Sequence, residues 1–272
     1  MELLKSNIKV GFDFEDWYSE DLSEQARRYR PIRLLKRLES LALQHGKFCL
    51  TTSGAMAAEL AKTYLSPVPV TIYNTFEIHP EKLTTEKYYR FPLRLFWFSQ
   101  TIGPGRGLEL FLASINKIEI DVEVHLLGEI SQAYKTEILD IQSRHPVIFH
   151  AMVPPDELSQ KIASFDIGLA LEEASPKSRN YTITNKFFQY LEAGLPVIAT
   201  PTIGQLEIFK TITPGFLITE YSSVVLAGLE KWLKSNSEIE KARNNAISLA
   251  WEYRSITQYN KLLHLVENAI SL

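Results

Sequence analysis

The sequence predicts an α/β protein built from parallel β-sheets that carry helices on both faces. Short apolar runs of strand length alternate with segments whose apolar residues recur at helical spacing. Such alternation is typical of βαβ units, in which a helix connects neighbouring parallel strands. The predicted strands span residues 8–12, 47–52, 68–73, 93–99, 122–128, 146–150, 166–171, 196–200 and 215–219.

Two of the predicted helices show a clear apolar stripe, which is expected to lie on a sheet. The stripes consist of Leu34, Leu35, Leu38, Leu41 and Ala42, and of Leu108, Phe111, Leu112 and Ile115. After Gly228 the chain is predicted to be mostly helical to its end. A terminal helical segment of this kind must pack on the rest of the molecule to be stable.

A polar segment at 78–93 carries two prolines and shows no clean period, so it indicates a boundary between two parts. We expect a partial N-terminal domain at 1–90, on the acceptor side, with about three strands. The remaining residues, 91–272, are expected to form a complete Rossmann-like domain with about six strands and terminal helices.

Composition excludes several classes of protein. A formal net charge of −3 and a pI near 6.1 lack the basic footprint of nucleic-acid binders, so no nucleic-acid partner is expected. The single cysteine, Cys49, excludes an internal disulfide and a cysteine-based zinc cluster, and it is expected in the core. Because no apolar run approaches the ~20 residues that cross a bilayer, a cytoplasmic location is expected.

The segment "RLFWFSQTIGPGRGLE" predicts a strand, a glycine-rich turn and a helix from Leu108. Such a unit directs unpaired backbone N–H groups toward a ligand above the strand end, and phosphate is the usual occupant. Gly103, Gly105 and Gly107 permit close approach and positive φ, and Arg106 can bind phosphate oxygens. The spacing matches neither a P-loop nor G-x-G-x-x-G. The alternative is a flexible turn with a solvated arginine.

A second strand–loop–helix unit follows at 166–200. Thr182 or Thr184 is expected to cap its helix, and Lys186 lies in the first helical turn. A cation at the positive end of a helix dipole is explained if an anion shares the site. The alternative is that Lys186 reaches solvent and Asn185 caps the helix locally.

These motifs, together with "LLGE" (126–129), "VPPDEL" (153–158) and "TNKFFQYLEAGLPVIAT" (184–200), resemble retaining glycosyltransferases of the two-Rossmann-domain (GT-B) kind. The resemblance is to group 1 glycosyl transferases, which include glycogen and sucrose synthases and bacterial glycan-biosynthesis enzymes. "VGFDFEDWYSED" (10–21), "CLTTSGAMAAELAKTY" (49–64) and "VTIYNTFE" (70–77) resemble the later part of the N-terminal domain in that family. Its first units have no counterpart, so we expect an upstream start, a second chain that supplies the missing half, or a remnant.

The resemblance implies a set of donor-binding residues. Gly103, Gly105, Gly107 and Arg106 would border the diphosphate of a nucleotide sugar, and Lys186 and Asn185 would lie near the phosphates or the sugar. The family's two glutamates would fall at Tyr181 and Gln189 and are not kept; Glu172 and Glu173 are the nearest acidic substitutes, with a solvated strand end as the alternative. Further donor contacts are expected at Gly128, Glu129, Val153, Gln189 and Tyr190.

Acidic residues cluster at the end of the first predicted strand. Asp13, Glu15 and Asp16 would face the cleft between the domains, and Glu15 stands where the family often has a histidine against the transferred sugar. We expect Glu15 and Asp16 to act with Arg106 and Lys186 in catalysis. Three acidic side chains could bind a divalent cation, but the resembled family usually binds its nucleotide without a metal, so no metal ligand is expected. Capping of the following turn is the alternative.

The predicted function is transfer of a sugar from a nucleotide-sugar donor to a glycan or lipid-linked acceptor, with retention and without a metal or other cofactor. The alternative is a non-catalytic remnant or subunit that keeps the nucleotide-sugar site, and an epimerase is less favoured. A basic run suggests peripheral contact with a membrane, and a solvated helix face is its alternative. The run consists of Arg27, Arg28, Arg30, Arg33, Lys36 and Arg37, with Tyr29 among them.

Overall fold

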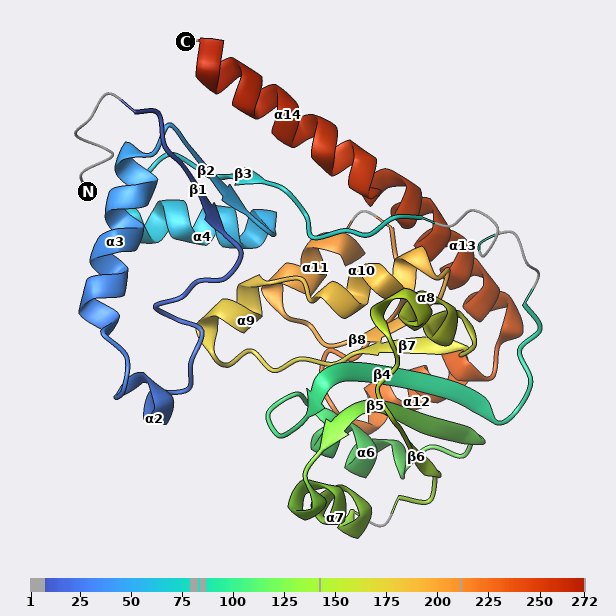
Figure 1. Ribbon diagram of the computed structural model, residues 1–272. Helices are drawn as coiled ribbons and strands as arrows, with labels where there is room; N and C mark the ends of the chain where they lie inside the picture. Colours follow the sequence, from blue (N-terminus) through green and yellow to red (C-terminus); the bar gives the residue numbers. More distant parts are fainter. Residues whose placement is uncertain (1–7, 79–82, 84–86, 142, 211, 272) are drawn as a thin grey trace.

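The computed structural model describes residues 8–78, 83, 87–141, 143–210 and 212–271. Its strands form two parallel sheets, one of three strands and one of six, as the alternating pattern predicted (Figure 1). The boundary segment at 78–93 lies partly outside the described residues, so the division at residue 90 stays a prediction.

The N-terminal part is a small parallel sheet with helices packed beside it. The strand order is β1-β2-β3, which leaves β1 at an edge. Its buried core includes Phe14, Trp17, Leu43, Met56 and Leu60. The elements are β1 (Gly11–Phe14), α2 (Glu24–Arg27), α3 (Ile32–His45), β2 (Phe48–Thr51), α4 (Gly54–Tyr64) and β3 (Val70–Thr71).

The second sheet has the doubly wound order β6-β5-β4-β7-β8-β9. The chain starts at the centre with β4, builds outward to β6, and then returns to build the other half from β7. Ligands of such sheets bind outside the carboxyl ends of the strands where the order reverses, here between β4 and β7. The strands are β4 (Leu93–Ile102), β5 (Val122–Ile130), β6 (Val147–His150), β7 (Ile167–Ala170), β8 (Val197–Ala199) and β9 (Gly215–Leu217).

Helices cover both faces of this sheet (Figure 1). One face carries α6 (Leu108–Ile115), α7 (Gln132–Asp140) and α12 (Ser223–Leu233). The other carries α8 (Pro155–Ala163), α10 (Asn185–Glu192), α11 (Ile203–Phe209) and α13 (Asn236–Tyr253). Among the helices of the described residues, none combines the length and the apolar composition needed to cross a bilayer.

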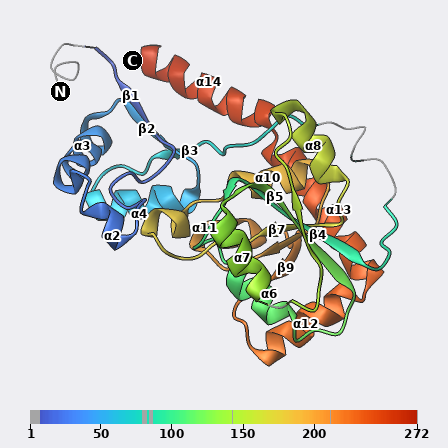
Figure 2. The ribbon, with the colours of Figure 1, turned by 60° about the horizontal axis from the view of Figure 1, so that its bottom comes forward.

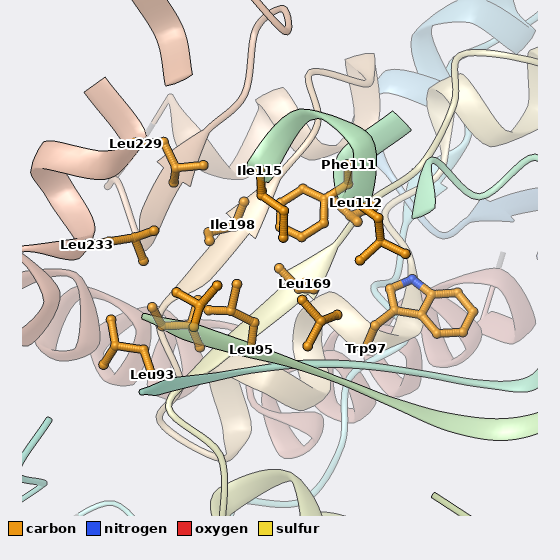
Figure 3. Packing of buried hydrophobic residues seen from close by; sticks show 14 of the residues in the cluster. Leu93, Leu95, Trp97, Phe111, Leu112, Ile115, Leu169, Ile198, Leu229 and Leu233 are labelled. Carbon is orange, nitrogen blue, oxygen red and sulfur yellow. The ribbon is translucent and has the colours of Figure 1, made fainter. Parts of the chain in front are cut away.

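The core on the first face shows why the apolar stripe of α6 was informative. Phe111, Leu112 and Ile115 are 0% exposed and pack against the side chains of β4 and β7 (Figure 3). Leu95 and Leu169 lie beneath them. Burying large apolar side chains of this kind stabilises the fold by roughly 1.5–3 kcal/mol each.

Two helices, one short and one long, join the N-terminal part to the rest. The helix α9 (Lys177–Tyr181) lies beside α4 in both views (Figures 1 and 2). The last helix, α14 (Ser255–Ser271), runs back to the three-stranded sheet, where Lys261 Nζ donates a hydrogen bond of 2.7 Å to the Thr71 carbonyl. The terminal helix therefore docks on the N-terminal part, as its stability requires.

Part of one predicted stripe was wrong. In α3, Ala42 is buried, but the side chains of Leu34 and Leu38 are 52% and 47% exposed. The sheet ends at β1, so no further strand or helix of the described residues covers them. An apolar groove of about 340 Å³, lined by Phe12 and Leu38 among others, lies at this edge.

Candidate active site

A cleft of about 680 Å³ lies between the two parts of the molecule, above the carboxyl ends of β4 and β7. This is the position at which a doubly wound sheet binds its ligand. Both parts contribute side chains to its walls. The predicted site residues that line it are Glu15, Asp16, Arg106, Val153, Glu172, Asn185, Lys186 and Gln189.

The glycine-rich turn places Arg106 at the cleft. Gly105 and Gly107 have φ of 72° and 75°, which a residue with a Cβ rarely adopts, so the predicted need for glycine is confirmed at both positions. Gly107 is the N-cap of α6, so the first backbone N–H groups of this helix lie next to the turn. Gly103, Gly105 and Gly107 are not among the residues that line the cleft, and the arginine side chain reaches it instead.

Glu172 is the centre of the site's charge. Its carboxylate is 0% exposed and accepts hydrogen bonds from Arg106 Nη1 at 3.0 and 3.1 Å and from Lys186 Nζ at 3.0 Å. Arg179 Nε lies 3.5 Å from its second oxygen. The solvated strand end considered for Glu172 is therefore wrong, as is the solvated arginine considered for Arg106.

Lys186 is buried rather than directed to solvent. Its residue is 7% exposed, and Nζ lies 4.5 Å from the centre of the Trp97 ring. Burial lowers the pKa of the ammonium, and the Glu172 carboxylate opposes that shift. The lysine is held by a cation–π contact and an ion pair at the N-terminus of α10, so the alternative of a solvated side chain is wrong.

The start of α10 differs in detail from the prediction. Thr184 takes the N-cap position, but its side chain makes no capping hydrogen bond, and the buried Oγ1 has no partner among the described residues. Thr182 Oγ1 instead donates to the Ser178 carbonyl at 2.9 Å. Both threonines line the cleft, so the helix presents uncapped backbone N–H groups there.

The sum of charges at this wall is positive. Arg106, Arg179 and Lys186 surround one buried carboxylate, so basic side chains outnumber the acidic one within this cluster. Such a surplus at a helix N-terminus favours a bound anion of two or more negative charges. Sequence reasoning missed Arg179, because it lies in the short polar helix α9, whose sequence carries no periodic or motif signal.

The opposite wall is acidic. Glu15, Asp16 and Asp21 line the cleft, whereas Asp13 does not. Burial, followed by repulsion from Asp21 and Glu15, raises the pKa of the Asp16 carboxyl. Thr52 Oγ1 donates to the Glu15 carbonyl at 3.2 Å and so ties this loop to the end of β2.

Replacing Asp16 by asparagine is expected to stabilise the protein at neutral pH. The folded-state pKa of Asp16 lies above its ordinary value of 3.8, so folding favours the protonated acid. The stability that this group contributes at low pH is therefore lost as the pH rises through the raised pKa. Thermal melts of wild type and variant should diverge as the pH rises above 3.8; parallel curves would show that the Asp16 carboxylate does not destabilise the fold.

Several predicted donor contacts do not line the cleft. Tyr190 is 0% exposed and donates from Oη to the Phe96 carbonyl at 2.9 Å, so its assignment to the donor site is corrected to a core role. A Cβ on Gly128 would lie 2.3 Å from the Ser99 carbonyl oxygen, which explains that glycine by packing. Glu129 and Glu173 are exposed outside the lining residues, and their assignment stays a prediction.

The basic run near the N-terminus is partly neutralised within the molecule. Glu20 forms ion pairs with Arg27 and Lys36, with N–O distances of 2.5 and 2.8 Å. Asp21 forms an ion pair with Arg30 at an N–O distance of 3.0 Å. The run therefore helps to fix the loop that follows β1 and the acidic wall of the cleft.

Comparison with solved structures supports the fold. HepE from Anabaena in complex with UDP-glucose aligns with 99% of this chain and 74% of its own, at a TM-score of 0.71 and 16% identity. Sucrose-phosphate synthase from Thermosynechococcus elongatus aligns with 99% of this chain and 70% of its own, at a TM-score of 0.73 and 13% identity. TarM from S. aureus, in a complex that contains UDP, aligns with 95% of this chain and 51% of its own, at a TM-score of 0.70 and 14% identity.

A search of curated protein sequences found no match. The family model of glycosyl transferases group 1 matches residues 93–233, which is just over half of the chain. The predicted GT-B fold and the predicted transferase class are thereby confirmed, whereas the retaining and bacterial glycan-biosynthesis assignments stay predictions. This chain belongs to the group 1 glycosyl transferases.

Proposed function

We propose that the protein transfers a sugar from a nucleotide-sugar donor to a glycan or lipid-linked acceptor, with retention at the anomeric carbon and without a metal. The observation that carries this proposal is the cation cluster of Arg106, Arg179 and Lys186 around the buried Glu172. HepE was solved with UDP-glucose, and TarM with UDP and α-GlcNAc-glycerol, which supports the same donor and acceptor kinds here.

In this proposal the cationic wall binds the donor's diphosphate. Arg106 and Lys186 contact phosphate oxygens, and the N-terminus of α10, where Thr184 and Asn185 line the cleft, directs backbone N–H groups at them. As the bond between the sugar and the diphosphate breaks, negative charge grows on the departing oxygen. Positive groups already in place lower that barrier. This charge stabilisation takes the role that a divalent cation has in other transferases, so EDTA should leave turnover unchanged; loss restored by Mg²⁺ or Mn²⁺ would contradict it.

The acidic wall faces the sugar and the acceptor. The acceptor oxygen forms a bond to the anomeric carbon on the face from which the diphosphate leaves, and the acceptor's proton passes to the departing phosphate oxygen. Glu15 contacts the transferred sugar and Asp16 orients the acceptor hydroxyl. Retention would be checked by the anomeric coupling of the first product by NMR, and an inverted anomer would contradict this geometry.

Replacing Arg106 by alanine should lower turnover about ten- to a hundredfold, because one hydrogen bond to a charged group contributes ~1.5–3 kcal/mol. The assay is release of nucleoside diphosphate from UDP-, GDP- and ADP-sugars in the presence of a mixed glycan and lipid-linked acceptor panel. Arg144→Ala, an exposed arginine outside the cleft lining, is the matched control and should keep wild-type turnover. Equal rates in both variants would remove Arg106 from the mechanism.

The same assay separates the enzyme from the non-catalytic alternative, which predicts binding of the donor without release of nucleoside diphosphate.

We also propose the domain division at residue 90. We further propose a second chain whose strand–helix units cover the edge of β1 and the exposed leucines of α3. A mass measurement of the active species would test that chain, since activity of the monomer alone would contradict it. Peripheral membrane contact through the basic run is proposed as well, and would fail if anionic vesicles do not bind the protein.

A further inference from the structure

Arg179 reaches the residue that precedes Arg106. Its Nη1 donates to the carbonyl oxygen of Gly105 and, at 3.3 Å, to that of Ser175. Its Nε lies 3.5 Å from the carboxylate of Glu172. The guanidinium therefore joins the glycine-rich turn after β4 to the loop after β7, across the point where the strand order reverses.

The carbonyl that Arg179 binds belongs to a glycine, whose backbone has more conformational freedom than that of other residues. Gly105 has φ of 72° and lies between a proline and Arg106, so rotation of its carbonyl would redirect the Arg106 side chain. Arg106 and Arg179 also repel each other, and burial followed by that repulsion lowers the pKa of Arg179. Glu172 offsets the repulsion because it pairs with both arginines.

The other side of α9 is anchored on the N-terminal part. The Ser178 N–H donates to the Glu20 carbonyl at 3.0 Å, and the Trp17 N–H donates to Ser178 Oγ at 3.1 Å. Lys177 Nζ pairs with Glu59 at 2.8 Å and lies 4.4 Å from the Trp17 ring centre. The short helix α9, which lies beside α4 (Figure 2), thus contacts the N-terminal part and, through Arg179, the glycine-rich turn.

We propose that Arg179 is a positioning residue for the diphosphate: it fixes the Gly105 carbonyl and thereby the direction of Arg106, and α9 makes this geometry depend on how the N-terminal part is seated. The inference rests on the proposed donor site and adds its control by the other part of the molecule. Arg179 acts through Arg106, so its loss affects the phosphate groups and leaves the nucleoside contacts unchanged.

Because Arg106 is proposed to bind the diphosphate, the loss of affinity should be larger for nucleoside diphosphates than for monophosphates. Arg179→Lys keeps a positive charge but loses the planar fork that bonds Gly105 and Glu172 together. Affinity for a nucleoside diphosphate should fall about tenfold, the effect of one lost hydrogen bond to a charged group. Affinity for the matching monophosphate should stay within about twofold. Lys177 lies outside the cleft lining, yet Lys177→Met should weaken diphosphate binding about two- to threefold because it releases α9.

The test is calorimetric binding by wild type, Arg179→Lys and Lys177→Met of UDP and UMP, GDP and GMP, ADP and AMP, and inorganic pyrophosphate, with a thermal melt of each protein. Equal losses for mono- and diphosphate, or no loss, would overturn the positioning role. One outcome separates the two proposals: wild type binds pyrophosphate but no nucleotide, and Arg179→Lys no longer binds pyrophosphate. In that case the donor proposal fails and the Arg179 proposal stands. If wild type binds none of the probes, both fail.

Discussion

Replacing Glu172 by glutamine is expected to lower the free energy of unfolding by about 3–5 kcal/mol, the cost of removing one partner from a buried ion pair. The carboxylate is 0% exposed and holds Arg106, Arg179 and Lys186 together. Without it, three cations remain at one wall, and Lys186 stays buried without its anion. Urea denaturation followed by circular dichroism measures the change.

The neighbouring Glu173 provides a matched control, because it is exposed and carries the same substitution. Glu173→Gln should change the free energy of unfolding by less than about 0.5 kcal/mol. A double variant, Glu172→Gln with Lys186→Met, should recover part of the loss since the buried charge leaves with its partner. Pyrophosphate should also stabilise Glu172→Gln more than wild type. An unchanged stability of Glu172→Gln would contradict the role of this carboxylate.

Lys186 determines whether the free energy of unfolding rises or falls with pH in the alkaline range. Burial holds the pKa of Lys186 below its ordinary value of 10.5 in the folded protein, so the unfolded chain binds more protons in the alkaline range. Removing Glu172 takes away the interaction that opposes this shift and lowers the pKa further. The free energy of unfolding of Glu172→Gln should therefore rise with pH through that window, and more steeply than that of wild type.

Replacing Lys186 by methionine should lower kcat about a hundredfold to a thousandfold, the usual effect of losing one preorganised group that stabilises transition-state charge. Lys186 lies at the start of α10, where the proposed leaving diphosphate gains charge. Because Nζ lies 4.5 Å from the Trp97 ring in a buried site, Lys186→Arg should not restore the rate.

Lys210→Met is the control for this substitution, since Lys210 is exposed at the end of α11. It should keep the wild-type kcat. If Lys186→Met raises KM and leaves kcat unchanged, the lysine binds ground state and transition state equally, and its assignment to leaving-group stabilisation would be wrong.

The α/β architecture could be predicted from the sequence because the patterns that indicate strands and helices are local. Each strand of the six-stranded sheet is a short apolar run, and the stripe of α6 has the period of a helix, so the α/β class follows from spacing alone. Positive φ at Gly105 and Gly107 also has a local signature, since glycine is the residue that tolerates it. The placement of Arg106 at a strand end followed from these two features.

The remaining parts of the site depend on contacts between distant residues. Glu172 and Arg106 are 66 residues apart, and no spacing indicates that they pair. Arg179 was missed for the same reason. Tyr190 and Lys186 share one short helix, but the tyrosine faces the core and the lysine faces the cleft, which only the packing of α10 decides. The exposure of Leu34 and Leu38 in α3 follows from the position of β1 at the edge of its sheet. A helical period in the sequence gives no information about where a sheet ends.

The central claim is that Arg106 and Lys186, both paired with Glu172, bind the diphosphate of a nucleotide sugar. Its most direct test is calorimetric titration of wild type and Arg106→Ala with intact UDP-, GDP- and ADP-sugars. We predict that wild type binds one of the three donor classes and that the variant binds the same donor about ten- to a hundredfold more weakly. Absence of binding by wild type to every donor, or equal affinity in both proteins, would contradict the claim.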